Sequence, residues 1–541
     1  MSLAQLLSVK KENPFRVKAY RRAARTIRAL GDSLEELVRE EADLTTLAGI
    51  GKGIESAIRE IVLSGASRRL EALRAEVSPE VAAISEYPGL DPAWVLRIYK
   101  KLKISSVEAL KEALANGEIA KHFGARMESH VRGAVTETHL ARLYDAGEIA
   151  QAAEEFLIAR CAVRRAEVGG DFRRKVEVIN EISFVIETAD FQSVLTCLQK
   201  FGGGSEMLSA DAGSALFKLA SGILLRIQNA AQKQWGLAMV LATGSDRHLE
   251  KLGRGKLSRL RASYPDEAAV YKKLGLTFIP PELREGGDEV ELAGRGALPV
   301  LITRQDIRGE LHAHSTSSDG AHTIEQMGRA AAALSYEYTG ITDHSKSLKI
   351  AGGVTEEDLW KQLRFIDRIN AKNGRIQILK SAEVDILADG TLDYTDDLLK
   401  ELDYTVCSIH SKFALGREEQ TERIMRAMDN RYFTILGHAT GRMLLKRPGY
   451  EIDLERIAAH ALKNGCFFEI NSSPDRLDLS ASNARLAREA GVKIAITTDA
   501  HSMREFELVE CGIEQARRAG LNRDSVLNTR PWPELQTLFR R

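Results

Sequence analysis

From about residue 305 onwards, histidines and acids recur at the ends of short apolar runs. His312 and His314 are two residues apart, and on an extended strand that spacing points both imidazoles to the same side. The other residues of metal-ligand type in this region are Asp319, His344, Glu383, His410, His438, Asp499 and His501. Nitrogen and oxygen ligands without a thiol suit Zn²⁺, Mn²⁺ or Fe²⁺ and disfavour Ca²⁺.

The size of this set predicts its chemistry. A single histidine in a strand is more often an ordinary core residue, but six histidines and three acids at strand ends favour a metal centre. Nine ligands exceed the needs of one tetrahedral or octahedral ion, so we predict two or three divalent ions. Such clustered ions ionise water at neutral pH and stabilise the oxygens of an in-line displacement at phosphorus.

Two basic residues lie just after ligand positions, Lys412 in "SIHSKF" and Arg442 in "GHATGRML". We predict that both contact the non-bridging oxygens of a bound phosphate. A surface salt bridge is the alternative role for each of them.

These side chains need a scaffold that gathers strand ends. Short apolar strands alternate with helices through the region: "YTGITDH", "IQILKSAEV", "YTVCSIH", "FTILGHA", "CFFEINS" and "KIAITTDAH". This alternation is typical of parallel β/α units, and so many units favour a barrel over an open sheet. Because parallel barrels carry their sites at the C-terminal ends of the strands, we expect the ligands to converge at one rim.

The region also resembles a known family. "HAHSTSSDG", "TDHS", "AEVDIL", "SIHSKF", "GHATGRML", "EINSSPDRLDL" and "TDAHS" are similar to the ordered motifs of the PHP (polymerase and histidinol phosphatase) domain, over residues 305–541. The resemblance implies a trinuclear phosphoesterase on a distorted (β/α)7 barrel. By analogy one ion would bind His312, His314, Glu383 and Asp499, and Glu383 would bridge to a second ion on His410 and His438. Asp319, His344 and His501 would hold a third.

The N-terminal region reads as helical and has features of DNA binding. "LAGIGKGI" is a helix-hairpin-helix signature, in which the turn at Gly49 and Gly51, followed by Lys52, presents backbone N–H groups to a phosphate. The basic segment 10–28 precedes it and contains Lys18, Arg21 and Arg22. A second hairpin at 87–104 has Asp91 in place of the usual glycine, and this acid would repel phosphate.

The order of elements resembles the bacterial and archaeal family X DNA polymerases over nearly the whole chain. The resemblance implies a multidomain α/β protein with a helical lyase-like domain at 1–75, helical fingers at 76–148, an α+β nucleotidyltransferase-like palm at 149–235, a thumb at 236–295 and the PHP domain at 305–541. "NPFRVKAYRRAARTI", "LAGIGKGI", "GGDFRRK", "ATGSDRH" and "YKKLGLTFIPPELREGGDEVELA" carry this similarity.

The sequence departs from that family where polymerase chemistry should lie. Glu181 and Ser183 occupy the positions of two metal-binding aspartates, and Leu224 occupies the third. Asp171 replaces a serine that helps to hold the triphosphate, Arg174 is retained in the same turn, and Ala57 stands where lyase-competent members have their lysine. Since nucleotidyl transfer needs carboxylates to place two Mg²⁺ ions, we predict that polymerase and lyase activities are lost. Arg173 and Arg174 would then support the fold or contact DNA.

Composition sets broader limits. The chain has 541 residues, 76 basic against 76 acidic side chains and 44% hydrophobic residues, which fits a soluble protein of several domains. With no run of about 18 apolar residues and no signal-peptide pattern, we predict a cytoplasmic, nucleoid-associated monomer without membrane contact. Five cysteines without a CxxC pair predict reduced thiols.

The function predicted from these features is a metal-dependent 3'-5' exonuclease or 3'-end phosphoesterase of DNA repair. Its expected partner is DNA with gaps, nicks or 3'-recessed ends. Three alternatives remain open: a non-catalytic scaffold of repair complexes, a residual DNA polymerase, and a small-molecule phosphatase.

Overall fold

A computed structural model describes residues 34–47, 49–64, 107–124, 140–372, 374 and 376–539, with single residues and short pieces elsewhere between 16 and 131. The chain forms two compact units, Met1–Phe278 with Leu445–Arg447, and Ile279–Leu444 with Pro448–Arg541. The second unit begins inside the range predicted for the thumb, and the other domain boundaries stay predictions. No helix among the described residues is long and apolar enough to span a membrane.

The second unit is built on a seven-stranded parallel sheet, which confirms the predicted (β/α)7 architecture. Its strands are β8 (Gly309–Glu310), β9 (Tyr338–Ile341), β10 (Gln377–Asp385), β11 (Tyr404–Ser408), β12 (Ile435–Leu436), β13 (Phe467–Asn471) and β14 (Ile494–Thr497), each paired with the next in sequence. After the two outer strands, His314 N donates to Ala500 O at 2.8 Å, so the sheet nearly closes into a barrel.

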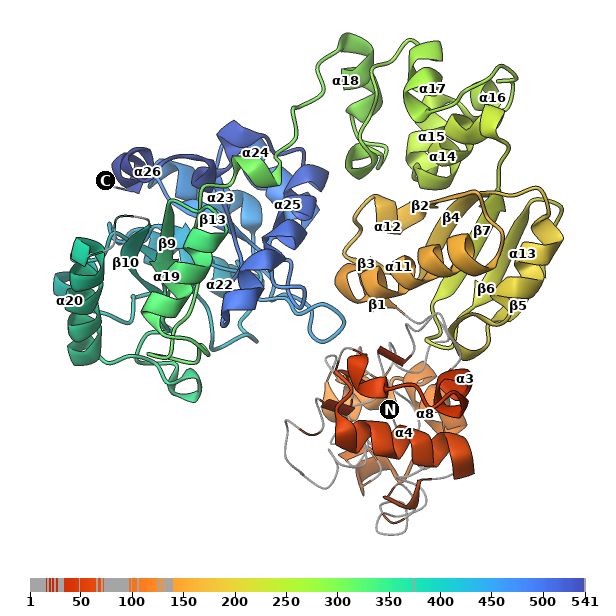
Figure 1. The fold of residues 1–541 in the computed structure, drawn as a ribbon. Coiled ribbons are helices and arrows are strands. Elements are labelled where there is room, and N and C mark those ends of the chain that lie inside the picture. The colour runs from red at the N-terminus through yellow and green to blue at the C-terminus, as the bar shows by residue number, and fades with distance from the viewer. Residues whose placement is uncertain are drawn as a thin grey trace. The chain divides into compact units, whose positions relative to one another are not determined.

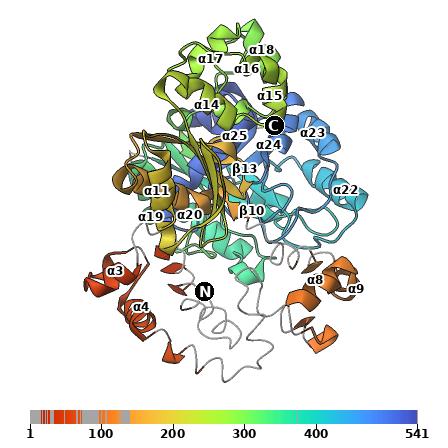
Figure 2. The same cartoon turned by 90° about the vertical axis from the view of Figure 1, so that its right-hand side faces the viewer.

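Helices follow most of the strands and cover the barrel. They are α19 (Ile324–Ala333), α20 (Glu356–Lys372), α21 (Asp396–Leu399), α22 (Arg417–Met428), α23 (Leu454–Lys463), α24 (Ala481–Glu489) and α25 (Val509–Arg518). Figure 1 shows α20 outside β9 and β10, and Figure 2 shows α22 and α23 outside the strands as well. In α23 the buried residues Leu454, Ile457, Ala458 and Ala461 form one apolar stripe, as helical periodicity requires.

The two ends of the barrel differ in chemistry. A buried apolar cluster that includes Leu311, Tyr404 and Ile435 packs against Leu535 and Phe539 of the C-terminal helix α26 (Trp532–Phe539). The strands begin at this apolar end of the barrel. The polar side chains at their C-terminal ends therefore lie at the opposite rim.

In the first unit a five-stranded sheet lies within the range predicted for the palm. Its order is β2 (Arg165–Gly169), β4 (Glu181–Glu187), β7 (Leu224–Asn229), β6 (Ser214–Lys218) and β5 (Glu206–Ala210), and only β4 and β7 are parallel. A two-residue ladder joins β1 (Ala141–Arg142) to β3 (Val178–Ile179). Ile182, Phe184 and Ile186 alternate into one core, so the polar face of β4 carries Glu181 and Ser183.

Helices surround this sheet and continue beyond it. They are α11 (Leu143–Arg160), α12 (Gly170–Arg173), α13 (Phe191–Leu198), α14 (Trp235–Thr243), α15 (Asp246–Leu252), α16 (Arg254–Leu257) and α17 (Glu267–Lys273), while α18 (Glu289–Arg295) belongs to the second unit. A disulfide joins Cys161, at the end of α11, to Cys197 on α13. The prediction of reduced thiols is therefore wrong for this pair, because the fold brings together two cysteines 36 residues apart in sequence.

The described part of the N-terminal region is helical. It comprises α3 (Leu34–Arg39), α4 (Lys52–Ser64), α8 (Val107–Ala115) and α9 (Glu118–Phe123). Gly49 has a φ of 80°, a left-handed conformation that glycine adopts without strain in the turn before α4. Lys18, Arg21 and Asp91 lie outside the described residues.

Candidate metal centre

The barrel brings all nine predicted ligands to one rim. His312 and His314 follow β8, His344 follows β9, and Glu383 lies near the end of β10. The others come from the segments after β8, β11, β12 and β14: Asp319, His410, His438, Asp499 and His501. Parallel strands with the same direction end at the same edge of the barrel, which is why residues up to 189 positions apart (312 to 501) meet there.

Glu383 is the centre of the cluster. Its Oε1 lies 2.9 Å from His438 Nε2 and 3.3 Å from His410 Nε2. Its Oε2 lies 2.7 Å from His344 Nδ1, 3.6 Å from His312 Nε2 and 3.7 Å from His314 Nε2. One fully buried carboxylate therefore faces five imidazoles, an arrangement suited to bridging two cations.

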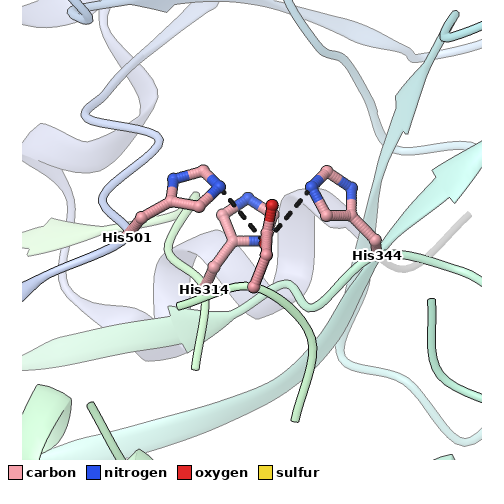
Figure 3. Close-up of side chains that lie close together, drawn as sticks. His314, His344 and His501 are labelled. Carbon is pink, nitrogen blue, oxygen red and sulfur yellow. Dashed lines mark ion pairs between the residues drawn. The ribbon is translucent and has the colours of Figure 1, made fainter. Parts of the chain in front are cut away.

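Two aspartates complete the arrangement on either side of His314. Asp499 Oδ1 lies 3.0 Å from His314 Nε2 and 3.5 Å from His312 Nε2. Asp319 Oδ1 lies 3.3 Å from His501 Nε2, 3.6 Å from His344 Nε2 and 3.9 Å from His314 Nδ1. Figure 3 shows the imidazoles of His314, His344 and His501 converging from separate segments.

Three groups of these side chains have ligand atoms within 4.8 Å of one another. They are His314 with Asp319, His344 and His501; His312 with His314 and Asp499; and His344 with Glu383 and His410. The geometry thus resembles the three predicted ion sets, with His314 and His344 each shared between two groups.

Several polar atoms at the centre lie close to opposite charges but are not hydrogen-bonded. His312 Nε2, His344 Nδ1 and Glu383 Oε2 are buried and form no hydrogen bond of good geometry with the described residues, although His344 Nδ1 and Glu383 Oε2 are only 2.7 Å apart. Buried polar atoms in folded proteins are nearly always hydrogen-bonded or bound to an ion. The residues present therefore fit divalent metal ions with nitrogen and oxygen ligands.

The cluster is strongly coupled electrostatically. Burial alone would raise the pKa of Glu383, but His344, His410 and the other imidazoles hold it well below its usual value. Burial lowers the pKa of His314 to about 4, whereas for His410 the carboxylates outweigh burial and raise its pKa to about 10. A histidine whose pKa is raised keeps both of its ring protons, and one of them must leave before that imidazole can bind a cation.

Two acids that sequence reasoning missed orient the ligands from behind. Glu469 Oε1 lies 2.6 Å from His312 Nδ1 and accepts from Thr497 Oγ1 at 2.6 Å, while its Oε2 accepts from His438 N. Asp385 Oδ1 lies 2.7 Å from His410 Nδ1. The sequence does contain a signal for both residues, namely an acid within an apolar strand: Glu469 in "CFFEINS" and Asp385 in "AEVDIL". Such partners fix the tautomer and direction of a metal-binding imidazole.

Replacing Glu469 with glutamine (Glu469→Gln) is expected to weaken metal binding by about 10- to 100-fold, the usual cost of losing an outer partner of a ligand. The reason is that the acceptor that holds the Nδ1 proton of His312 would lose its negative charge, and a neutral amide makes a weaker hydrogen bond to the imidazole. Titration with Mn²⁺ followed by calorimetry measures the change, and Glu455→Gln on the exposed side of α23 is the matched control. Equal affinity in Glu469→Gln and wild type would contradict an orienting role.

The two predicted phosphate contacts differ in their surroundings. Lys412 is exposed just after His410. The guanidinium of Arg442, in contrast, donates from Nε to Arg476 O at 3.0 Å and from Nη2 to Leu477 O, so it holds a backbone segment. Arg476, which the sequence reasoning did not single out, places its Nε 3.7 Å from Asp499 Oδ2. Arg476 therefore places a positively charged side chain beside the Asp499 part of the cluster.

The palm positions form a closed network of their own. Arg226 donates from Nε and Nη2 to the two oxygens of Glu181 at 2.7 and 2.8 Å, and Ser183 Oγ donates to Glu181 at 2.9 Å. Leu224 lies directly opposite Glu181 in the β4–β7 register. The hydrogen bond to Glu181 raises the pKa of Arg226 further, which keeps the guanidinium charged. Arg226 therefore binds both oxygens of Glu181, the one acid among the three matching positions.

The neighbouring arginines have structural contacts. Arg173 forms a double hydrogen bond with Glu267 on α17 at 3.0 and 2.6 Å. Arg174 pairs with Asp171 and donates to Thr243 O at 2.7 Å. These bonds join α12 to α14 and α17, which favours the fold-supporting role for both arginines.

Of the predicted DNA-binding residues, Arg22, Gly49, Gly51 and Lys52 lie within the described part. A Cβ on Gly49 would lie 2.8 Å from the Arg22 side chain, so Arg22 packs against the hairpin turn. Lys52 is exposed at the start of α4. The free N–H groups of a helix N-terminus beside such cations are typical of phosphate binding.

Comparisons with known proteins agree with both ends of the chain. Residues 1–67 match the helix-hairpin-helix domain model, and residues 310–473 match the PHP domain model. The DNA polymerase/3'-5' exonuclease PolX of Bacillus subtilis is 33% identical over 567 residues, covering 100% of this chain and 98% of that protein. A probable phosphatase of Thermoanaerobacter sp. strain X514 is 31% identical over 41% of this chain and 89% of its own length.

Proposed function

The chain belongs to the family of PolX, the family X DNA polymerases with a PHP domain, and from this premise we propose that it is a metal-dependent 3'-5' exonuclease that processes DNA ends in repair. The observation that carries the proposal is the cluster of nine ligand residues around Glu383, several of whose buried ligand atoms form no hydrogen bond with the described residues. At the positions that match the polymerase aspartates, by contrast, the one acid, Glu181, is paired with Arg226.

Two or three ions of zinc, manganese or iron would be held by the nine ligands already described. Bound divalent ions supply ionised water at neutral pH and stabilise negative charge on phosphate oxygens. The protein's own contribution is to position and orient the side chains that would bind these ions. Glu469 and Asp385 fix two imidazoles, and burial of Glu383 and His312 keeps bulk water from the centre.

The scissile phosphate enters from the side of Asp319 and His501. These two side chains keep 36% and 35% of their surface exposed, while Glu383 and His312 have none. Arg476 contacts a non-bridging phosphate oxygen from the Asp499 side, because a guanidinium matches phosphate geometry with two parallel N–H donors. Lys412 is the second candidate for such a contact.

The DNA substrate is expected to have a gap, a nick or a 3'-recessed end, with the helix-hairpin-helix region holding the phosphate backbone through Gly49, Gly51 and Lys52. Lys18 and Arg21 would add positive charge to the same contact with the DNA phosphates. A cytoplasmic, nucleoid-associated location and a monomeric state remain predictions.

A 3'-recessed duplex with a label at the 5' end of the shorter strand tests polarity and metal dependence together. With Mn²⁺ we expect a ladder of labelled products that shortens with time, and with excess EDTA we expect no digestion. Immediate release of the label as a mononucleotide would instead show digestion from the 5' end and contradict the proposed polarity.

A second function has support from the probable phosphatases among the relatives. The same centre would remove a terminal 3'-phosphate, since a phosphomonoester offers the ions the same oxygens as a diester. An oligonucleotide with a 3'-phosphate separates the two activities: phosphate release without shortening of the strand would favour this second function.

A further inference from the structure

A cavity of about 620 Å³ lies between the loop that carries Asp319 and the helix α20. Thr316 and Ser317 form one wall, and Gln362, Phe365 and Arg368 of α20 form another. Cavities of about 300–1,000 Å³ are typical of sites for small organic ligands. None of these five residues belongs to the ligand set of the metal centre.

The cavity wall is connected to that ligand set through Asp343. Gln362 Nε2 donates to Asp343 Oδ2 at 3.0 Å. Ser315 N and Ser318 Oγ donate to Asp343 Oδ1 at 2.8 and 2.6 Å. Since Ser315 follows His314 and Ser318 precedes Asp319, one hydrogen-bonded network fixes both the cavity wall and two metal ligands.

The lining combines an aromatic face with a cation. Phe365 is half-buried, and the Arg368 guanidinium lies over its ring at 5.6 Å from the ring centre. Lys361, also in the lining, is paired with Glu357 at 2.8 Å and with Asp358 at 2.9 Å. Among the described residues Arg368 has no such carboxylate partner, so its charge remains available to a ligand.

The rest of the lining includes hydroxyl groups, the amide of Gln362 and two acids. Hydroxyl groups come from Thr316, Ser317, Thr323 and Thr355. Gln362 is only 6% exposed, and its Oε1 accepts no hydrogen bond from the described residues. Glu325 and Asp358 in the same lining disfavour a bare inorganic anion. The cavity therefore suits a heteroaromatic ring with hydrogen-bonding edges, attached to one negative group.

We propose that this cavity binds the base and sugar of the DNA nucleotide adjacent to the scissile phosphate, with the base on Phe365 and the neighbouring backbone phosphate on Arg368. Aromatic side chains and arginines are the groups on which proteins stack single-stranded bases without reading their sequence. The inference rests on the proposed exonuclease function, because it names the place of the substrate strand at the same centre.

The test compares two substrates of one centre. Phe365→Leu and Arg368→Ala are assayed with Mn²⁺ on a 3'-recessed duplex and on bis(p-nitrophenyl) phosphate, which is too small to fill the cavity and reach the metals. We expect KM for DNA to rise by about fivefold or more, the lower limit for losing one stacked base. Hydrolysis of the small diester should stay at the wild-type rate. Phe365→Tyr, which retains the aromatic face, should restore the DNA affinity.

Arg364→Ala is the matched control, since Arg364 is exposed on the same helix and does not line the cavity. DNA digestion by Phe365→Leu and Arg368→Ala at wild-type KM would overturn the inference. If the wild-type protein fails to digest DNA, the proposed function is wrong, and titration with thymidine 5'-monophosphate then decides the cavity separately. If thymidine 5'-monophosphate binds the wild-type protein and binds Phe365→Leu more weakly, the result supports the cavity as a nucleotide site. If it does not bind the wild-type protein, the inference is overturned.

Discussion

Replacing Glu383 with glutamine (Glu383→Gln) is expected to lower DNA digestion by more than about a hundredfold, the upper limit for changes outside the ligand set. The substitution keeps the size of the side chain but removes the charge that faces five imidazoles. A neutral amide could not take the role of a buried carboxylate that would bridge two bound cations. His312→Ala and Asp499→Ala are expected to give similar losses, since both residues belong to the same ligand group.

The measurement is the rate of shortening of a labelled 3'-recessed strand with Mn²⁺, together with elemental analysis of each purified variant. Glu455→Gln serves again as the control for loss of a carboxylate on the surface. If the three ligand variants digest DNA as fast as wild type, the phosphoesterase hypothesis is wrong. Retained DNA binding in that case would favour the scaffold interpretation.

Primer extension is expected to fail, even with Mn²⁺ and all four deoxynucleotides. Nucleotidyl transfer needs several carboxylates to place two metal ions. At the matching positions the chain has Glu181, Ser183 and Leu224, and Arg226 bonds to both oxygens of the one acid. The assay is best performed in Glu383→Gln, so that digestion does not hide slow extension.

A matched pair of variants makes this second prediction sharper. Incorporation that persists in Glu383→Gln and disappears on adding Glu181→Gln would show that the palm retains polymerase activity, against our interpretation. Incorporation at background in both variants would agree with a palm whose role is structural. The ion pairs of Arg173 with Glu267 and of Arg174 with Asp171 fit that structural role.

Much of the metal centre was predictable because parallel barrels impose a simple rule. Every strand points the same way, so a histidine or acid at a strand end must reach the same rim, whatever its distance in sequence. The alternation of short apolar runs with helices predicted the barrel, and the ligand list followed from residue type and position. The resemblance to family X polymerases also placed Glu181 and Leu224 on neighbouring strands, whereas their direct pairing was decided by the register of those strands.

What only the tertiary structure decided are pairings that no local pattern specifies. Glu469 lies 157 residues from His312, and Arg226 lies 45 residues from Glu181, yet each pair is hydrogen-bonded. The Cys161–Cys197 disulfide, the position of Arg476 beside Asp499 and the cavity at Phe365 likewise arise from packing. The sequence by itself determined which residues meet at the rim, because strand direction fixes that. The structure decided which atom each side chain faces, because orientation depends on neighbours brought together only by folding.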